Sequence, residues 1–306
     1  MCYPAMVLAD HMKLERLYGA RIDDAFYEQT VKVRWWEGLA KLPKGIDDSL
    51  LARGGTAAEY VQKWRERRAD ELTQELFAQK RRVADAQRSL QLKETKKARE
   101  DIRIGSDKMS KAQLALDDLR RKEPLPRDSR VFPGMFTSVI ISEGGQRVIK
   151  PMRYQCRPCG KPSSYDRQYP GTYNARRDNL EGFWKGQFGV SHGLMVATRF
   201  YENVEGPDGR NQVLEFVPRD GEPMLIACLW SQWTDPKGKE PDLLSFAAIT
   251  DEPEPEAAAA GHDRTIINIK PEYIDDWLNP EPSNLHGLYK IFDDKRHPYY
   301  EHRIAA

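Results

Sequence analysis

Residues 195–201 read MVATRFY, a short and largely apolar run that ends directly before Glu202. Six further runs of this kind lie between residues 135 and 269, and they occupy residues 135–142, 147–151, 213–217, 225–230, 244–249 and 265–269. Turn signals separate several of them: Gly144-Gly145, Gly206-Pro207-Asp208-Gly209 and Asp220-Gly221-Glu222-Pro223. Many short strands without regular intervening helices predict an α+β fold with an antiparallel, barrel-like β core.

Helix-forming residues dominate an earlier part of the chain, residues 56–123. This segment contains no proline and a single glycine, Gly105, and it is rich in Arg, Lys, Glu, Gln, Ala and Leu. Leu72, Leu76 and Val83 fall near helical spacing. The pattern predicts two long helices with a break around residues 104–108, inserted as a charged hairpin into a single domain of residues 1–306.

The same segment is more basic than the chain as a whole. Residues 61–123 contain 18 Lys or Arg and 12 Asp or Glu, whereas the whole chain carries a net charge of only +1. One interpretation is an arm that binds nucleic acid or a partner. The other is a solvated hairpin whose helices are covered by ion pairs of mixed sign, and the mixture of signs favours this second interpretation.

Composition limits the remaining possibilities. The 306 residues are 40% hydrophobic and 31% charged, enough for one large core or one core with an appendage. Because the net charge is +1, a nucleic-acid surface must be a local patch. No apolar run approaches the roughly 18 to 20 residues that span a membrane. With four cysteines and no signal peptide, we expect a soluble, cytoplasmic protein without a disulfide framework.

Cys2 follows the initiator methionine directly, in Met1-Cys2-Tyr3-Pro4-Ala5. If Met1 is removed, Cys2 carries an α-amine and a thiol on adjacent carbons. The amine can condense with an aldehyde to a Schiff base, and the thiol can then close onto the imine carbon to form a thiazolidine. The reference pKa values, about 7.7 to 8.0 for the amine and about 8.5 for the thiol, mean that both groups need activation near neutrality. The alternative for Cys2 is a buried position on a first strand.

Four stretches downstream follow one another in a fixed order. They are residues 151–154 (PMRY), 173–176 (YNAR), 199–202 (RFYE) and 262–264 (HDR), the last before Trp277-Leu278. Together with Cys2 this order resembles the SRAP family, the SOS-response-associated peptidases or abasic-site processing proteins. The resemblance covers the first few residues and about residues 131–282. The opening Cys2-Tyr3-Pro4 departs from the family's Cys-Gly-Arg and lacks its phosphate-contacting Arg, as expected of a divergent, phage-related subgroup.

The resemblance implies a function and a set of site residues. It implies binding of single-stranded DNA with abasic sites, covalent capture of the ring-opened sugar aldehyde on Cys2, and lyase activity through the Schiff base. Glu202 would assist the amine and the imine, His262 would act as acid and base on the opened sugar, and Asn174 would orient the amine or a substrate oxygen. Phosphate and base contacts would come from Arg153, Tyr154, Arg176, Arg177 and Arg199, because arginines interleaved with aromatic rings suit a single strand.

Two other functions remain open from the sequence. One is a cysteine peptidase or amidohydrolase in which Cys2 is the nucleophile and removes its own Met1. The other is a non-catalytic DNA- or partner-binding protein that works through the hairpin. Cys156 and Cys159 form only half of a zinc site, so we expect no metal and no cofactor. We further expect a monomer that joins the nucleoid when bound to DNA.

Overall fold

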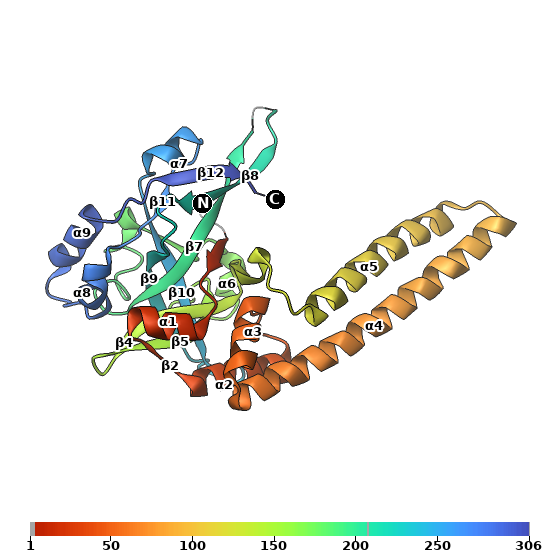
Figure 1. Cartoon of the computed structure of the whole chain (residues 1–306), viewed down its shortest axis with the longest axis horizontal. Helices are drawn as coiled ribbons and strands as arrows, with labels where there is room; N and C mark the ends of the chain where they lie inside the picture. Colours follow the sequence, from red (N-terminus) through yellow and green to blue (C-terminus); the bar gives the residue numbers. More distant parts are fainter. Residues whose placement is uncertain (1–3, 207, 306) are drawn as a thin grey trace.

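A closed ring of five strands forms the centre of the protein (Figure 1). The computed structural model describes residues 4–206 and 208–305. The ring strands are β4 (Phe136–Glu143), β5 (Gln146–Tyr154), β7 (His192–Glu205), β9 (Met224–Trp233) and β10 (Leu243–Asp251). The pairings β5–β4, β4–β7, β7–β9 and β9–β10 are antiparallel, and a parallel pairing of β10 with β5 closes the ring. The predicted α+β fold with a barrel-like core is therefore confirmed.

Shorter strands extend the sheet at its edges. They are β1 (Ala5–Val7), β2 (Arg21–Ile22), β3 (Arg130–Val131), β6 (Asn174–Arg176), β8 (Asn211–Pro218), β11 (Thr265–Ile266) and β12 (Tyr300–Ile304). Each of the seven predicted runs contains a strand, although only the first two residues of the run 265–269 form β11. β7 is long enough to pair with β9 and β4 near its start and with β1 and β8 near its end.

Short helices surround the ring. They are α1 (His11–Tyr18), α2 (Asp24–Glu37), α3 (Lys44–Arg53), α6 (Tyr165–Gln168), α7 (Pro255–Ala259), α8 (Ile274–Leu278) and α9 (Leu285–Asp293). The 3₁₀ turns are η1 (Pro126–Ser129), η2 (Arg177–Asn179) and η3 (Pro271–Tyr273). Within the two described ranges, no helix has both the length and the apolar character needed to cross a bilayer.

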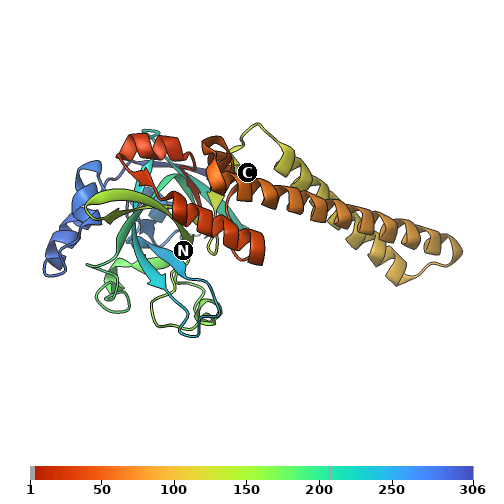
Figure 2. The same cartoon turned by 90° about the horizontal axis from the view of Figure 1, so that it is seen from below.

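Two long antiparallel helices, α4 (Gly55–Leu92) and α5 (Lys96–Arg120), project from the ring as a hairpin (Figures 1 and 2). The predicted break around residues 104–108 is wrong, because the chain turns at residues 93–95, where the Thr95 hydroxyl caps α5 by accepting from the Ala98 amide. Gly105 lies buried inside α5, and a Cβ there would stand 2.6 Å from Val83 Cγ2. Gly105 therefore permits close helix packing instead of ending a helix.

A buried ion pair ties α2 to α3 beside the root of the hairpin. Arg34 Nη2 lies 2.9 Å from Asp47 Oδ1, and the two side chains are 2% and 3% exposed. The Arg34 guanidinium also stacks over the Trp64 ring of α4, with 4.1 Å between its Cζ and the ring centroid. Removal of either partner leaves an uncompensated charge in the core.

We predict that Asp47→Ala lowers the free energy of unfolding by about 3–5 kcal/mol, because the Arg34 charge loses its buried partner. Chemical denaturation measures the loss. Asp107→Ala is the matched control, because Asp107 pairs with Lys111 on the hairpin surface with 57% of its side chain exposed. That control should change stability by about 0–1 kcal/mol. Equal losses in the two variants would show that the buried pair has no special role.

Candidate active site

A buried carboxylate–imidazole pair joins β7 to the loop between α7 and β11. Glu202 Oε2 on β7 lies 2.8 Å from His262 Nε2, and the side chains are 0% and 4% exposed. The loop is anchored by a hydrogen bond from the His262 amide to the Ala257 carbonyl of α7. The structure thus brings together the two residues that the sequence predicted as the acid and base of the site.

The hydrogen bonds of His262 fix how many protons the pair holds. Nδ1 lies 2.8 Å from the Arg264 carbonyl, which can only accept, so Nδ1 carries a hydrogen. The Arg264 amide approaches Nδ1 as well, but at 3.3 Å that contact is the weaker one. A hydrogen bond between Nε2 and Glu202 then requires a second proton, on the ring or on the carboxyl group. The pair can therefore release one proton and take it back, as a general acid and base must.

The surroundings of His262 favour the charged imidazolium. Burial disfavours that charge, but the hydrogen bond that His262 donates to Glu202 and the negative charge of the Glu202 carboxylate outweigh the effect, and the pKa of His262 is raised above its ordinary value. An unperturbed histidine titrates at about pH 6.5, so the raised pKa extends the protonation of His262 to higher pH.

The described chain begins close to this pair. β1 runs antiparallel to β7 with Ala5 opposite Phe200, and the Tyr201 amide donates a 3.0 Å hydrogen bond to the Pro4 carbonyl. Pro4 therefore lies beside the residue that precedes Glu202. Cys2, the predicted nucleophile, lies outside the described residues.

Strand β10 holds the remaining polar residues of this region. Asn174 on β6 pairs in parallel with Ala248 of β10 and is 9% exposed. On the opposite side of β10, Thr250 pairs with Ile266 of β11, which follows the His262 loop. The predicted Asn174 is thus held by the same strand that fixes the start of β11.

A cavity of about 380 Å³ next to the His262 loop collects three arginines, Arg176, Arg177 and Arg264. Arg176 is 45% exposed and pairs with Asp178, and Arg177 pairs with Asp251 of β10. Two of the predicted DNA-contacting residues therefore share one cavity with an arginine two positions after His262.

A second group of arginines lies on the face of β7 opposite to the Glu202 side chain. Arg199 of β7 and Arg130 of β3 both stand opposite Met6 of β1, so their side chains lie on one face of the sheet. Together with Arg303 they line a groove of about 610 Å³. Glu215 binds Arg199 and Arg303, and the Arg130 guanidinium lies 3.8 Å from the Tyr201 ring centroid. No sequence pattern pointed to Arg130 or Arg303, because only long-range strand pairing brings them to Arg199.

Arg153 and Tyr154, the other two predicted DNA contacts, are engaged in the protein body. The Arg153 side chain is 14% exposed and its Nη1 donates to Asp166 Oδ2 over 2.7 Å. The Tyr154 ring is 2% exposed and stacks on Phe246 with 5.1 Å between centroids. Both side chains already have protein contacts that a nucleic acid would have to replace.

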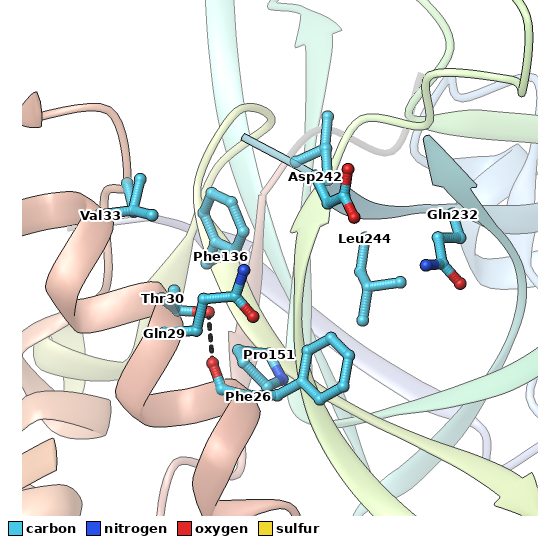
Figure 3. Close-up of a pocket in the computed structure, with 11 residues that line it drawn as sticks. Phe26, Gln29, Thr30, Val33, Phe136, Pro151, Gln232, Asp242 and Leu244 are labelled. Atoms are coloured by element: carbon cyan, nitrogen blue, oxygen red, sulfur yellow. Dashed lines mark hydrogen bonds between the residues drawn. The ribbon is translucent and has the colours of Figure 1, made fainter. Parts of the chain in front are cut away.

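Two further features lie outside this site. A cavity of about 100 Å³ between α2 and the ring is lined by Phe26, Val33, Phe136, Pro151 and Leu244, and none of the predicted site residues lines it (Figure 3). Cys156 is buried and Cys159 is exposed, and both thiols are free. In residues 4–206 and 208–305, no three His, Cys, Asp or Glu side chains gather in an arrangement that could hold a metal ion.

We predict that Glu202→Gln lowers the pKa of His262. Because the folded pKa is raised, the pair stabilises the fold fully below about pH 6.5 and loses this contribution as the pH rises through the folded pKa. The pH dependence of the melting temperature should therefore be weaker in the variant over that window. An NMR titration of His262 in both proteins measures the shift. An unchanged titration curve of His262 would mean that Glu202 does not raise the pKa of His262.

Comparison with known proteins identifies the family. The family model described as SOS response associated peptidase (SRAP) matches residues 82–303. Among solved structures, a protein from Bordetella bronchiseptica has a TM-score of 0.48 at 18% identity over 58% of this chain and 87% of that chain. A protein from Bacteroides thetaiotaomicron has a TM-score of 0.47 at 15% identity over 58% and 78%.

A phage-related protein from Bordetella bronchiseptica has a TM-score of 0.45 at 18% identity, over 60% of this chain and 84% of that chain. No curated protein matches the sequence. The family match covers most of the chain and includes both Glu202 and His262. The chain belongs to the SRAP family.

Proposed function

We propose that this protein is an abasic-site sensor that binds single-stranded DNA and crosslinks to the ring-opened sugar through Cys2. Membership of the SRAP family supports a DNA-damage-associated function related to abasic sites. The crosslink itself is our proposal, and one observation carries it. The buried, proton-sharing pair of Glu202 and His262 lies one residue along β7 from the contact between Tyr201 and Pro4.

Chain connectivity supports the participation of Cys2. Only Tyr3 lies between Cys2 and Pro4, and two residue steps span at most about 7 Å when the chain is extended. The Pro4 carbonyl is held by the amide of the residue next to Glu202. With Met1 removed, the amine and thiol of Cys2 would therefore be within reach of the carboxylate.

The proposed reaction assigns each proton to a named group. Glu202 takes a proton from the Cys2 ammonium, and the free amine attacks the aldehyde carbon of the opened sugar. Loss of water, with a proton donated by His262, gives the imine. The Cys2 sulfur then bonds to the imine carbon while its proton passes to the nitrogen, and the thiazolidine ring is complete. The imine formed on the way is also the species from which β-elimination would cut the strand.

The two arginine groups supply a path for the strand. Arg264, with Arg176 and Arg177, lies two residues after His262, and Arg199, with Arg130, lies three residues before Glu202. Side chains alternate along a strand, so Arg199 and Glu202 point to opposite faces of β7. The DNA strand would therefore meet Arg264, Arg176 and Arg177 on the His262 side, and Arg199 and Arg130 on the other face of β7.

We predict that wild-type protein forms an adduct with single-stranded abasic DNA that survives heat and denaturant, and that Cys2→Ser loses it. Serine can stop only at the reversible imine. Gel analysis after heating, together with the intact mass that reports removal of Met1, measures the outcome. Cys159→Ser is the control, because Cys159 is an exposed free thiol with no role in the proposed reaction. A heat-stable adduct of equal yield from Cys2→Ser refutes the mechanism, and an adduct with undamaged DNA refutes the need for the aldehyde.

Arg176→Ala and Arg199→Ala should each weaken the binding of undamaged single strands. Each lost phosphate contact reduces the slope of log K against log salt by about 0.7 for a single strand. Fluorescence anisotropy at several salt concentrations measures the slope. Arg210→Ala is the control, since Arg210 is 87% exposed and lies in neither arginine group. If the slopes of the two test variants equal the wild-type slope, the strand follows another path.

A further inference from the structure

The positive charge of the hairpin is confined to its outer half. Residues 78–111, called here the distal arm, contain 11 Lys or Arg and 5 Asp or Glu, an excess of six. The inner parts of the two helices are balanced, with 4 basic and 4 acidic residues in 61–77 and 3 of each in 112–123. Because the whole chain carries only +1, everything outside the distal arm has an excess of five negative charges. The charges of this chain are thus segregated along its length.

Ion pairing inside the distal arm leaves a defined set of cations uncompensated. All five acidic residues are already paired: Asp85 with Arg88, Glu94 with Arg99, Glu100 with Arg103, Asp101 with Arg82, and Asp107 with Lys111. Five other basic side chains of the distal arm are exposed and form no ion pair with any described residue. They are Lys80, Arg81, Lys93, Lys96 and Lys97.

Folding of the hairpin gives no reason for this excess. The apolar contact of the two helices is centred on Leu72, Ala112 and Leu116, near the body. Farther out, the helices approach closely through small buried residues, Ala86, Ala98 and Gly105. Like charges gathered on exposed helix faces repel one another and destabilise the fold. A bound anionic partner would remove that cost.

The position of the distal arm keeps its cations away from the rest of the protein. α4 has 38 residues, which corresponds to a length of about 57 Å at 1.5 Å per residue. The hairpin points away from the ring, and its tip stands clear of the other elements in both views (Figures 1 and 2). Arg81 and Lys97, one from each helix, line a groove of about 480 Å³ between the helices. Asp85 and Asp101 line it too, but they are already paired with Arg88 and Arg82, so a phosphate at the rim would meet unpaired cations from both helices.

The residue types of the distal arm indicate which polyanion fits. Residues 78–111 contain no Phe, Trp, Tyr or His. Single strands are held by base stacking on aromatic rings as well as by phosphate contacts, whereas a duplex hides its bases and offers two rows of phosphates. Cations without rings therefore suit the backbone of a duplex.

We propose that the distal arm docks on the phosphate backbone of duplex DNA that flanks the single strand held at the active site. The choice of DNA as partner rests on the proposed function, whereas the docking surface rests on the charges described above. Contact through phosphates alone would be independent of sequence. It would enlarge the DNA footprint and select sites where single-stranded and duplex DNA meet.

The test measures binding of the full-length protein to an undamaged 30-base-pair duplex by fluorescence anisotropy between 50 and 200 mM salt. The variant combines Lys80→Gln, Arg81→Gln, Lys96→Gln and Lys97→Gln, all at exposed positions where glutamine preserves the helix. Five phosphate contacts predict a fall in wild-type affinity on the order of 500-fold over this salt range. The variant keeps one phosphate contact, so its affinity should fall only about 4-fold over the same salt range.

Controls separate the docking surface from net charge and from folding. Lys13→Gln, Arg16→Gln, Arg120→Gln and Lys122→Gln together remove the same charge from exposed positions outside the distal arm, and this variant should keep the wild-type salt dependence. Lys80→Arg, Lys96→Arg and Lys97→Arg retain the charge and should bind as the wild type does. Circular dichroism should give equal helix content in all variants.

Crosslinking to a short abasic single strand keeps the two proposals distinguishable. The glutamine variant of the distal arm should crosslink at the wild-type rate, because none of its four positions lies at the active site. If crosslinking fails in every protein, the active-site mechanism is wrong while the duplex measurement still stands. The docking proposal is overturned by equal salt slopes in the wild type and the glutamine variant. It is also overturned if the distal arm instead causes self-association, detected by sedimentation, through the acidic remainder of a second copy.

Discussion

The structure depends on β10, which is hydrogen-bonded to four other strands: β5, β6, β9 and β11. Its parallel contact with β5 closes the ring. The chain then leaves that edge after Tyr154 and returns to it at Asn174, so the same edge also carries β6. The opposite edge carries β11, which follows His262. One strand therefore fixes the closure of the ring and two of the segments around the candidate site.

Burial gives the pair of Glu202 and His262 its chemical character. A carboxylate with no exposed surface would be costly to charge alone, and the same is true of a buried imidazolium. Together they can hold one proton across a contact of 2.8 Å in a medium of low dielectric constant, where charge-assisted hydrogen bonds are strong. The two side chains stabilise each other, and the pair gains or loses its proton as one unit. This property suits proton transfers that must run in both directions during one reaction.

The sequence predicted local features well and distant contacts poorly. Alternating apolar runs predicted the strands, and the ordered motifs led to Glu202 and His262 before their contact was visible. Gly105 was misread as a helix breaker, because sequence shows that a side chain is absent but not that Val83 fills the space. The parallel closure by β10 and the meeting of Arg130 with Arg199 depend on strand register across tens of residues. The total charge of the hairpin likewise did not reveal that the excess of positive charge lies near its tip.

The hairpin joins the body at one end only, where α4 packs on α2 and α3. Its outer part stands clear of the other described elements, so its length is independent of the ring (Figures 1 and 2). Evolution can therefore lengthen or shorten the hairpin by adding or removing whole turns in both helices at once. Changing both helices together keeps the facing residues in register. Such paired changes would alter how far the protein reaches while leaving its chemistry untouched. The same freedom makes the tip a natural place to graft another module.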